Sequence, residues 1–276
     1  MVRLVVDSTS EIDFKEAENL GIKLIPMKVI FDGEEFVVGI NMSNKEFYEK
    51  IQASKELPKT TQINITEYID CIKPLIDNGE EVLVMSLSSA LSGSFNSLKI
   101  AKEEIGSSKL EVFDTFSVTF GYKALVLEAL KLIKNNKSLK DIVEELRLLR
   151  EKLRLYAIID NVKYLVKGGR LSQAKGLAVT ALNIKPLVTL KDGKLELIGK
   201  AIGVNGALKH FCQLIKNVDT SRVMFAGHAN DLTKAEKMID TVRKEKGLKI
   251  DNICEIGSVI GTHAGPGCVG VVYFEK

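Results

Sequence analysis

The sequence has few cysteines and no pair of them at the spacing of a metal or redox site. Cys71, Cys212, Cys254 and Cys268 are widely separated, and none belongs to a Cys-x-x-Cys motif. A structural zinc site and a disulfide framework are therefore not expected, and we expect no metal. The cysteines fit core positions in a protein of the reducing cytoplasm.

Long apolar runs and blocks of one charge are also missing. No segment approaches the roughly 18 apolar residues of a membrane span, and the first ten residues, MVRLVVDSTS, lack the apolar core of a secretory signal. The 39 basic and 36 acidic residues are interspersed and leave a net charge of +3. Because they form no Lys/Arg block, we expect a soluble protein that does not bind nucleic acid.

The first half of the chain alternates apolar, β-branched runs with amphipathic stretches. Strands are predicted at residues 2–6, 22–31, 82–85 and 110–113. Helix starts are marked by a capping box at Ser43 and Glu46, by Thr66, and by Ser138 with Asp141. This alternation predicts a three-layer α/β/α domain with a mostly parallel sheet over residues 1–154.

The second half has more closely spaced strands. Residues 187–190 and 195–198 flank Asp192-Gly193, a dipeptide typical of a β-hairpin turn. Further strands are predicted at 223–226, 253–256 and 269–274, and helices at 206–216 and 231–246. We expect a smaller α/β domain with a mixed sheet over residues 155–276, and a ligand cleft between the two domains.

Polar residues gather where three predicted N-terminal strands end. The clusters are Asp7 to Ser10, then Ser88, Ser89, Ser92, Gly93 and Ser94, and then Asp114, Thr115 and Ser117. Ligands of parallel α/β sheets bind at this edge, and hydroxyls with free N–H groups at a helix start suit a carboxylate or phosphate. Ordinary turn chemistry, with Ser92 only capping the next helix, explains any one cluster but explains the three together less well.

Five segments resemble the motifs of the DegV family, in the same order and at similar spacings. They are VVDSTS at 5–10, PKTTQIN at 58–64, SLSSALSGSFNS at 86–97, KGGRLS at 167–172 and GTHAGPGCVG at 261–270. The resemblance covers the whole chain. It implies two α/β domains that hold a long-chain fatty acid, with the acyl chain in an apolar tunnel and the carboxylate near the surface. It also implies delivery of that fatty acid to a separate kinase that makes acyl phosphate, with no chemistry by the binding protein.

The resemblance also implies which residues bind the carboxylate. Thr60 and Thr61 align with the Thr-Ser of the family's TSQPS motif and would supply hydroxyls. Ser92 would supply a further hydroxyl, and Gly93 would supply amides at the start of a helix. His263 would supply a hydrogen-bond donor. A buried carboxylate needs such partners because an unpaired one is costly. The alternatives are a polar loop pair for the threonines and a structural histidine for His263 in its glycine-rich loop.

Gly168, Gly169 and Arg170 resemble the family's GGR element near the mouth of the site. An arginine there could hold a phosphate through a bidentate contact after the kinase has acted, or could face the kinase. The alternative is a pair of glycines that ends a helix, followed by a solvated arginine.

Two segments depart from the family pattern. Ile63 and Asn64 stand where the family has Pro and Ser, which leaves the threonine pair intact. The segment from Ala201 to Asn205 stands where many relatives carry an arginine and a basic pair. If that basic patch docks the kinase, this protein uses another partner surface or does not serve the kinase. Fatty-acid binding survives this departure better than kinase delivery does.

The leading hypothesis is a cytosolic, non-catalytic fatty-acid carrier with no cofactor besides its bound lipid. The sequence leaves open whether lipid is loaded by transient contact with a membrane surface or from another protein. The rival is a serine hydrolase of acyl esters, with Ser92 as nucleophile, His263 as base and Asp7 or Asp114 orienting it, although Ser92 lacks a GxSxG elbow. A dihydroxyacetone-kinase-like unit lacks the expected phosphate loop.

Overall fold

The computed structural model describes residues 2–54, 56–171 and 183–276. Its strands are β1 (Val2–Asp7), β2 (Lys23–Ile25), β3 (Lys28–Phe31), β4 (Glu34–Val37), β5 (Lys59–Thr61), β6 (Glu81–Ser86), β7 (Leu110–Asp114), β8 (Leu153–Ile158), β9 (Ile184–Lys191), β10 (Lys194–Ile202), β11 (Phe225–His228), β12 (Asn252–Glu255) and β13 (Val269–Phe274). Its α-helices are α1 (Phe14–Leu20), α2 (Asn44–Ala53), α3 (Ile65–Asp77), α4 (Ser94–Ile105), α5 (Thr119–Lys134), α6 (Leu139–Lys152), α7 (Val162–Lys167), α8 (Gly203–Leu214), α9 (Leu232–Lys246) and α10 (Ser258–Ala264). A 3-10 helix, η1 (Ser8–Ser10), follows β1.

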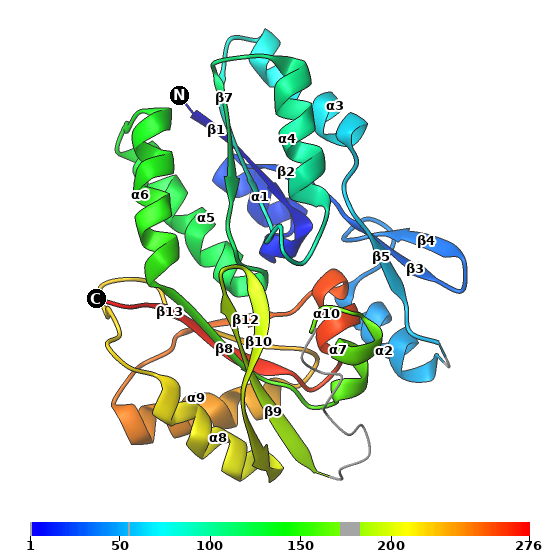
Figure 1. Cartoon of the computed structure of the whole chain (residues 1–276), viewed down its shortest axis with the longest axis vertical. Helices are drawn as coiled ribbons and strands as arrows, with labels where there is room; N and C mark the ends of the chain where they lie inside the picture. Colours follow the sequence, from blue (N-terminus) through cyan, green and yellow to red (C-terminus); the bar gives the residue numbers. More distant parts are fainter. Residues whose placement is uncertain (1, 55, 172–182) are drawn as a thin grey trace.

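The N-terminal sheet is four-stranded, parallel and ordered β2-β1-β6-β7. Helices α3 and α4 lie on one side of it, and α5 and α6 lie on the other (Figure 1). Because both faces are covered, residues 82–85 of β6 are buried without alternation. The predicted parallel sheet between helical layers is confirmed.

The C-terminal sheet is six-stranded, with the order β10-β9-β8-β13-β11-β12. Its pairs are antiparallel except for β11 with β12, so the predicted mixed sheet is also confirmed. Asp192 and Gly193 connect β9 to β10 with φ values of 49° and 75°. Two successive positive φ values belong to the type I′ turn that an Asp-Gly dipeptide favours.

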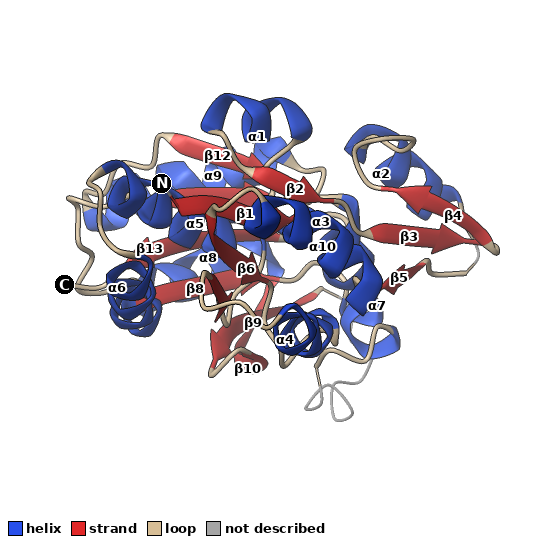
Figure 2. Ribbon diagram, turned by 90° about the horizontal axis from the view of Figure 1, so that it is seen from above, coloured by secondary structure: helices blue, strands red, loops and turns tan. Residues whose placement is uncertain are grey.

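The strand predicted over residues 22–31 is wrong as a single element. β2 joins the parallel sheet, whereas β3 joins a separate three-stranded antiparallel sheet in the order β4-β3-β5. Pro26 lies between them and cannot donate a ladder hydrogen bond, and the next amide, that of Met27, donates to Ser8 Oγ at 3.0 Å. Figure 2 shows this small sheet and α2 at one side of the molecule, beside α10 and α7.

Two of the three predicted helix starts are confirmed. Ser43 and Glu46 form a complete capping box before α2, and Ser138 Oγ accepts from the Asp141 amide at 3.2 Å before α6. Thr66 does not start a helix. The cap of α3 is Asn64, whose side chain accepts from the Glu67 amide at 2.9 Å while the Glu67 carboxylate accepts from the Asn64 amide at 2.8 Å.

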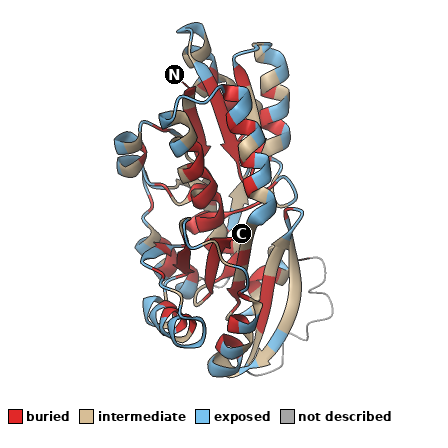
Figure 3. Ribbon diagram, turned by 90° about the vertical axis from the view of Figure 1, so that its left-hand side faces the viewer, coloured by how far each residue is buried: buried red, intermediate tan, exposed pale blue. Residues whose placement is uncertain are grey.

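Two groups of buried apolar side chains form the core. Figure 3 shows that the buried residues lie mainly on the strands and on the helix segments that cover them. The larger one runs through both sheets and includes Val84 of the parallel sheet and Phe274 of the mixed sheet. The smaller one lies between the mixed sheet and the pair α8 and α9, around Phe211 and Met238. The division of the chain at residues 154/155 stays a proposal; β8, which begins at Leu153, already belongs to the mixed sheet.

Candidate functional site

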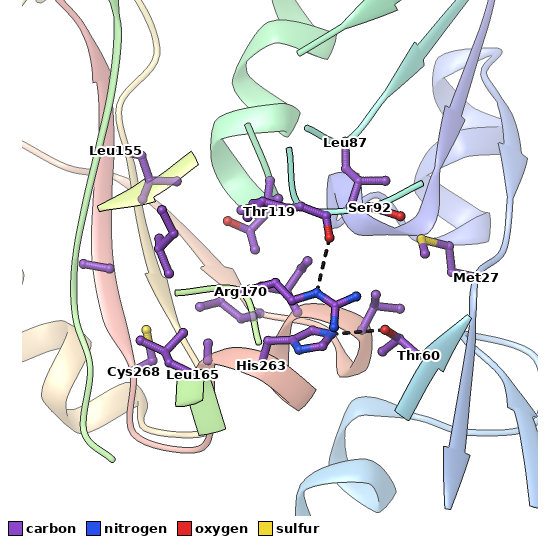
Figure 4. Close-up of a pocket in the computed structure, with 18 of the residues that line it drawn as sticks. Met27, Thr60, Leu87, Ser92, Thr119, Leu155, Leu165, Arg170, His263 and Cys268 are labelled. Carbon is purple, nitrogen blue, oxygen red and sulfur yellow. Dashed lines mark hydrogen bonds between the residues drawn. The ribbon is translucent and has the colours of Figure 1, made fainter. Parts of the chain in front are cut away.

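One pocket lies among elements from both halves of the chain. It encloses about 1030 Å³, including its open mouth, and is lined by Thr60, Thr61, Ser92, Gly93, Arg170 and His263. These are the six residues expected at the site from the sequence. Its apolar wall includes Phe120, Leu155, Ala157, Ile159, Val188 and Val259. Figure 4 shows Arg170, His263 and Thr60 near one another, with Leu155 on the side away from Thr60.

Thr60 and His263 are in hydrogen-bonding contact, with 3.1 Å between Thr60 Oγ1 and His263 Nε2. Thr60 lies on β5, where it pairs with Val29 of β3, and His263 lies near the end of α10. Helix α10 packs on β3 and β5, so the short antiparallel sheet places the threonine hydroxyl against the imidazole. Thr60 and His263 are 203 residues apart in the sequence, so this hydrogen bond brings two distant motifs together.

The surroundings of His263 disfavour its charged form. Burial, and to a smaller extent the nearby Arg170 guanidinium, lower its pKa from 6.5 to about 4. Its Nδ1 atom is buried and has no hydrogen-bond partner within the described residues. The imidazole therefore contacts the pocket through Nε2, where it could pair with an anionic head group.

The serine-rich loop is connected to the threonine segment through Ser94. Ser92 Oγ lies 3.0 Å from Ser94 Oγ and accepts from the Ser94 amide at 3.2 Å. Ser94 Oγ in turn accepts from the Ile63 amide at 3.2 Å. The N-cap of α4 is Gly93 and has no side-chain cap hydrogen bond, so Ser92 is not the cap that the alternative requires; Ser92 accepts from the first residue of the helix and also lines the pocket.

Gln62 covers Gly93 and was not identified from the sequence. A Cβ at Gly93 would lie 2.0 Å from Gln62 Oε1, so a larger residue there would displace the end of the Gln62 side chain. The Gln62 amide group donates to Ser97 Oγ at 3.3 Å. The two motifs therefore pack closely at Gly93, and Gln62 is an additional residue that lines the pocket.

Arg170 bridges two segments at the mouth. Its guanidinium donates to the carbonyl oxygens of Gly168 at 2.7 Å and Leu91 at 3.3 Å, and the side chain is exposed. Gly168 ends α7, and Gly169 has a φ of 68°. Both interpretations of this element have support: the glycines end a helix, and the arginine lines the pocket. Ser172 of the same motif lies outside the described residues.

Asp7 and Asp114 organise the loops behind the pocket. Asp7 is buried, accepts from the amides of Thr9 at 2.9 Å and Leu87 at 3.2 Å, and has its pKa raised to about 6 by desolvation. Asp114 accepts from the amides of Ser89 at 3.3 Å and Phe116 at 3.0 Å. Asp7 thus connects the ends of β1 and β6, the switch point of the parallel sheet, and Asp114 connects the loops that follow β6 and β7.

These contacts do not assemble the triad of a serine hydrolase. Within the described residues, the side-chain partner of His263 is Thr60, that of Ser92 is Ser94, and neither Asp7 nor Asp114 contacts the imidazole. A general base needs an orienting partner on its second nitrogen, and His263 Nδ1 has none here. The geometry therefore favours binding over hydrolysis.

Phe120 is a further pocket residue that the sequence analysis missed. Its ring lies over Gly227 of β11 and Gly270 of β13, which are paired residues on adjacent strands of the mixed sheet. A Cβ at Gly227 would lie 1.9 Å from the ring, so the missing side chains create the space for it. The preceding residue, Thr119, also lines the pocket and has a φ of 52°, which is rare for a β-branched residue. Nothing local in the sequence indicates either feature.

Two further observations concern the described residues alone. They contain no group of three or more His, Cys, Asp or Glu side chains placed to hold a metal ion. Their helices are all too short or too polar to cross a membrane.

A family model described as "Uncharacterised protein, DegV family" matches residues 1–276. The chain belongs to the DegV family. A DegV domain-containing protein of Clostridium acetobutylicum is 30% identical over 282 residues, which cover 100% of this chain and 99% of the relative. The family predicted from the five motifs is confirmed.

Solved structures of DegV proteins share the whole fold. A fatty acid binding DegV family protein from Streptococcus agalactiae has a TM-score of 0.92 at 27% identity, covering 100% of this chain and 99% of that one. DegV from Bacillus subtilis, described as a fatty acid binding protein, has a TM-score of 0.84 at 29% identity with the same coverage. The two-sheet α/β fold predicted for the chain is therefore that of the DegV structures.

Proposed function

We propose that this chain is a cytosolic, non-catalytic carrier that binds one long-chain fatty acid in the pocket. The observation that carries the proposal is the convergence of Thr60, Thr61, Ser92, Gly93 and His263 at the polar end of a single, mostly apolar cavity. The fatty-acid binding of the similar proteins from Streptococcus agalactiae and Bacillus subtilis supports the same assignment.

The polar end suits a carboxylate. The Thr60, Thr61 and Ser92 hydroxyls can donate, and Gly93 lies at the N-cap of α4, where the positive end of the helix dipole favours an anion. His263 is neutral when the pocket is empty, and an adjacent carboxylate favours its protonated form. Arg170 at the mouth adds positive charge near the head group. Together these groups compensate the desolvation of an anion.

The apolar wall suits an acyl chain. Leu155 and Ala157 lie on one face of β8, Ile159 directly follows that strand, and Val188 of β9 pairs with Ala157. Each methylene buried against such a wall contributes about 0.8 kcal/mol. A long tail thus supplies most of the binding free energy, while the polar end fixes its orientation.

We further propose that the protein delivers its bound fatty acid to a separate kinase. An open cleft lined by Lys99, Arg170 and the serine loop adjoins the polar end of the pocket, so the carboxylate would lie next to an exposed basic surface. The segment from Ala201 to Asn205 instead presents Ile202, with 80% of its surface exposed, at the end of β10. A kinase would then dock at the Lys99 and Arg170 side.

The first experiment is native mass spectrometry of the purified protein, followed by organic extraction and identification of whatever it carries. We expect one long-chain fatty acid per chain, or stoichiometric uptake of added fatty acid by delipidated protein. An empty protein that also refuses added fatty acid would contradict the proposal. Turnover of p-nitrophenyl esters that Ser92→Ala abolishes would support a hydrolase instead.

The polar clamp is tested by variants that remove one hydroxyl each. Ser92→Ala and Thr61→Val should retain the fold and lose bound lipid, with affinity reduced on the order of tenfold for each lost hydrogen bond to the charged head group. Thr66→Val, at an exposed position of α3, is the matched control. Unchanged lipid content in both clamp variants would rule out the proposed clamp while leaving fatty-acid binding intact.

Kinase delivery is tested separately with loaded protein. Charge reversal at the proposed docking side, Lys99→Glu, should reduce acyl phosphate formation by an added fatty acid kinase while lipid binding is unchanged. The control is Lys73→Glu on α3, which points to solvent and pairs with Asp77. Equal phosphorylation of the two variants would place the docking surface elsewhere.

A further inference from the structure

The pocket and a second cleft meet at Leu155. The second cleft measures about 1260 Å³ to its open side, and its wall includes Phe116, Arg150, Leu153, Leu190 and Ile198. Leu155 is the residue that lines both cavities, and 7% of its surface is exposed. Figure 4 places Leu155 on the far side of the pocket from Thr60, which belongs to the polar end.

The two cavities follow each other along β8. Leu155, Ala157 and Ile159 line the pocket, whereas Leu153 and Leu155 line the second cleft. Side chains two residues apart on a strand lie on the same face and about 7 Å apart. The side chain of Leu155 therefore separates the two cavities. Ala157 is small and leaves space in the middle of the pocket, and Leu155 ends that space.

Leu155 is held firmly in this position. β8 is an inner strand between β13 and β9, Leu155 pairs with Val272, and its carbonyl oxygen accepts from Thr189 Oγ1 at 2.8 Å. On its other side, a Cβ at Gly121 of α5 would lie 3.4 Å from Leu155 Cδ1, so the helix packs directly on the side chain. The backbone of Leu155 is thus fixed within the sheet, and α5 supports its side chain on one side.

The second cleft has apolar surface next to Leu155. Leu153 and Leu190 pack in the same apolar cluster as Leu155, and the Arg150 guanidinium is already engaged over the Phe116 ring at 4.0 Å and with the Asp114 carbonyl oxygen at 2.7 Å. Charged residues, among them Glu151, Arg154, Lys191 and Asp192, also line the cleft. An acyl tail that passed Leu155 would therefore meet the apolar surface of Leu153 and Leu190.

We infer that Leu155 closes the far end of the pocket and sets the longest acyl chain that the protein holds. This rests on the proposed function. Leu155 acts on the methyl end of the ligand alone, so the polar clamp is the same for every chain length. Replacing Leu155 by a smaller residue joins the two cavities and admits longer chains.

The test is competition among saturated fatty acids of 14 to 22 carbons for delipidated protein, read by native mass spectrometry. Leu155→Ala should move the preferred length by two or more carbons, with the ratio of the longer to the shorter chain rising on the order of tenfold. Leu155→Val, which is less disruptive to the core, should move the preference in the same direction by less.

Two matched controls separate the partition from a general increase in space. Leu98→Ala on α4 removes the same side-chain atoms from a buried position that lines neither cavity, and Leu153→Ala enlarges only the second cleft, so both should keep the wild-type length preference. An unchanged preference in the Leu155 variants, or an equal shift in Leu98→Ala, would overturn the inference while fatty-acid binding stands. Failure of the wild-type protein to bind any fatty acid would overturn the proposed function, and this inference with it.

Discussion

Gly168 packs directly against the imidazole of His263. A Cβ at Gly168 would lie 2.5 Å from His263 Nδ1 and 2.8 Å from the Tyr164 carbonyl oxygen, closer than nonbonded atoms approach. The backbone φ of Gly168 is −71°, which any residue can adopt, so the requirement for glycine comes from this contact. The KGGR and THAGPG motifs are therefore parts of one structure, in which the end of α7 holds the histidine in the pocket.

Gly168→Ala should displace His263 and weaken fatty-acid binding. We expect about tenfold lower affinity, because the head group loses one well-placed partner, and a loss of about 1–3 kcal/mol in the free energy of unfolding from overpacking. Fatty-acid titration and urea unfolding measure the two effects. Gly206→Ala on α8 is the control, since a Cβ there lies 3.8 Å from its nearest neighbour. Wild-type affinity in Gly168→Ala would contradict the role given to this contact.

Thr60→Val should weaken binding while leaving the fold intact. Valine matches the shape of threonine and suits a β-strand, but it cannot donate to a carboxylate. A lost hydrogen bond to a charged group corresponds to roughly a 10- to 100-fold lower affinity. Binding of a fatty acid and of the matching fatty alcohol should both be measured. The alcohol lacks the charge, so a loss of equal size for both ligands would show that Thr60 acts on the cavity shape and not on the carboxylate.

Local signals in the sequence were sufficient for several elements. Asp192-Gly193 marks its hairpin because two positive φ values suit that dipeptide. The same dipeptide signal occurs at Asp32-Gly33, which joins β3 to β4 with φ values of 50° and 87°. Pro26 marks the break that divides residues 22–31 between two sheets. The wrong single strand thus came from counting apolar residues and not from a missing signal.

Several residues that line the candidate pocket were predictable from the sequence, but their contacts were not; their binding role stays a prediction. Thr60, Ser92, Arg170 and His263 each stand in a motif, and the structure brings all four to one pocket. The 3.1 Å contact between Thr60 and His263 depends on how α10 packs on β5, which no local pattern encodes. Phe120 was missed for the same reason, because its place depends on glycines in two distant strands.

The pKa of His263 should report occupancy of the pocket. In the ligand-free protein the imidazole should titrate near pH 4, because burial and Arg170 disfavour its charged form. A bound carboxylate favours the imidazolium, so fatty acid should raise this pKa. NMR titration can follow it, since the chain has three histidines and His263→Gln assigns the signal. A midpoint that does not change when fatty acid is added would place the carboxylate away from His263.

The same lowered pKa predicts an acid dependence of stability in the ligand-free protein. Between pH 6.5 and pH 4 the unfolded chain binds a proton at His263 and the folded chain does not, so folding free energy is lost as the pH falls. The loss approaches about 3 kcal/mol at pH 4. Asp7, with its pKa raised to about 6, acts in the opposite direction over part of this range. Comparing urea unfolding of the wild type with His263→Gln isolates the histidine, and parallel pH profiles for the two proteins would contradict the prediction.

Gly227→Ala should destabilise the protein through Phe120. The added Cβ would lie 1.9 Å from Phe120 Cε1 and 2.3 Å from Cδ1, and the ring cannot retreat because it also packs over Gly270. We expect a loss of about 3 kcal/mol in the free energy of unfolding, at the upper end of overpacking effects. Phe120→Leu removes the ring atoms that collide, and alone it should lower the free energy of unfolding by less than Gly227→Ala does.

The double variant Gly227→Ala/Phe120→Leu should therefore be more stable than the sum of the two single losses predicts. The added methyl group fills part of the gap left by the smaller side chain, and the smaller side chain removes the collision. Urea unfolding of the four proteins measures this coupling, and strictly additive losses would mean that the ring and the glycine do not share the contact that shapes this wall of the pocket.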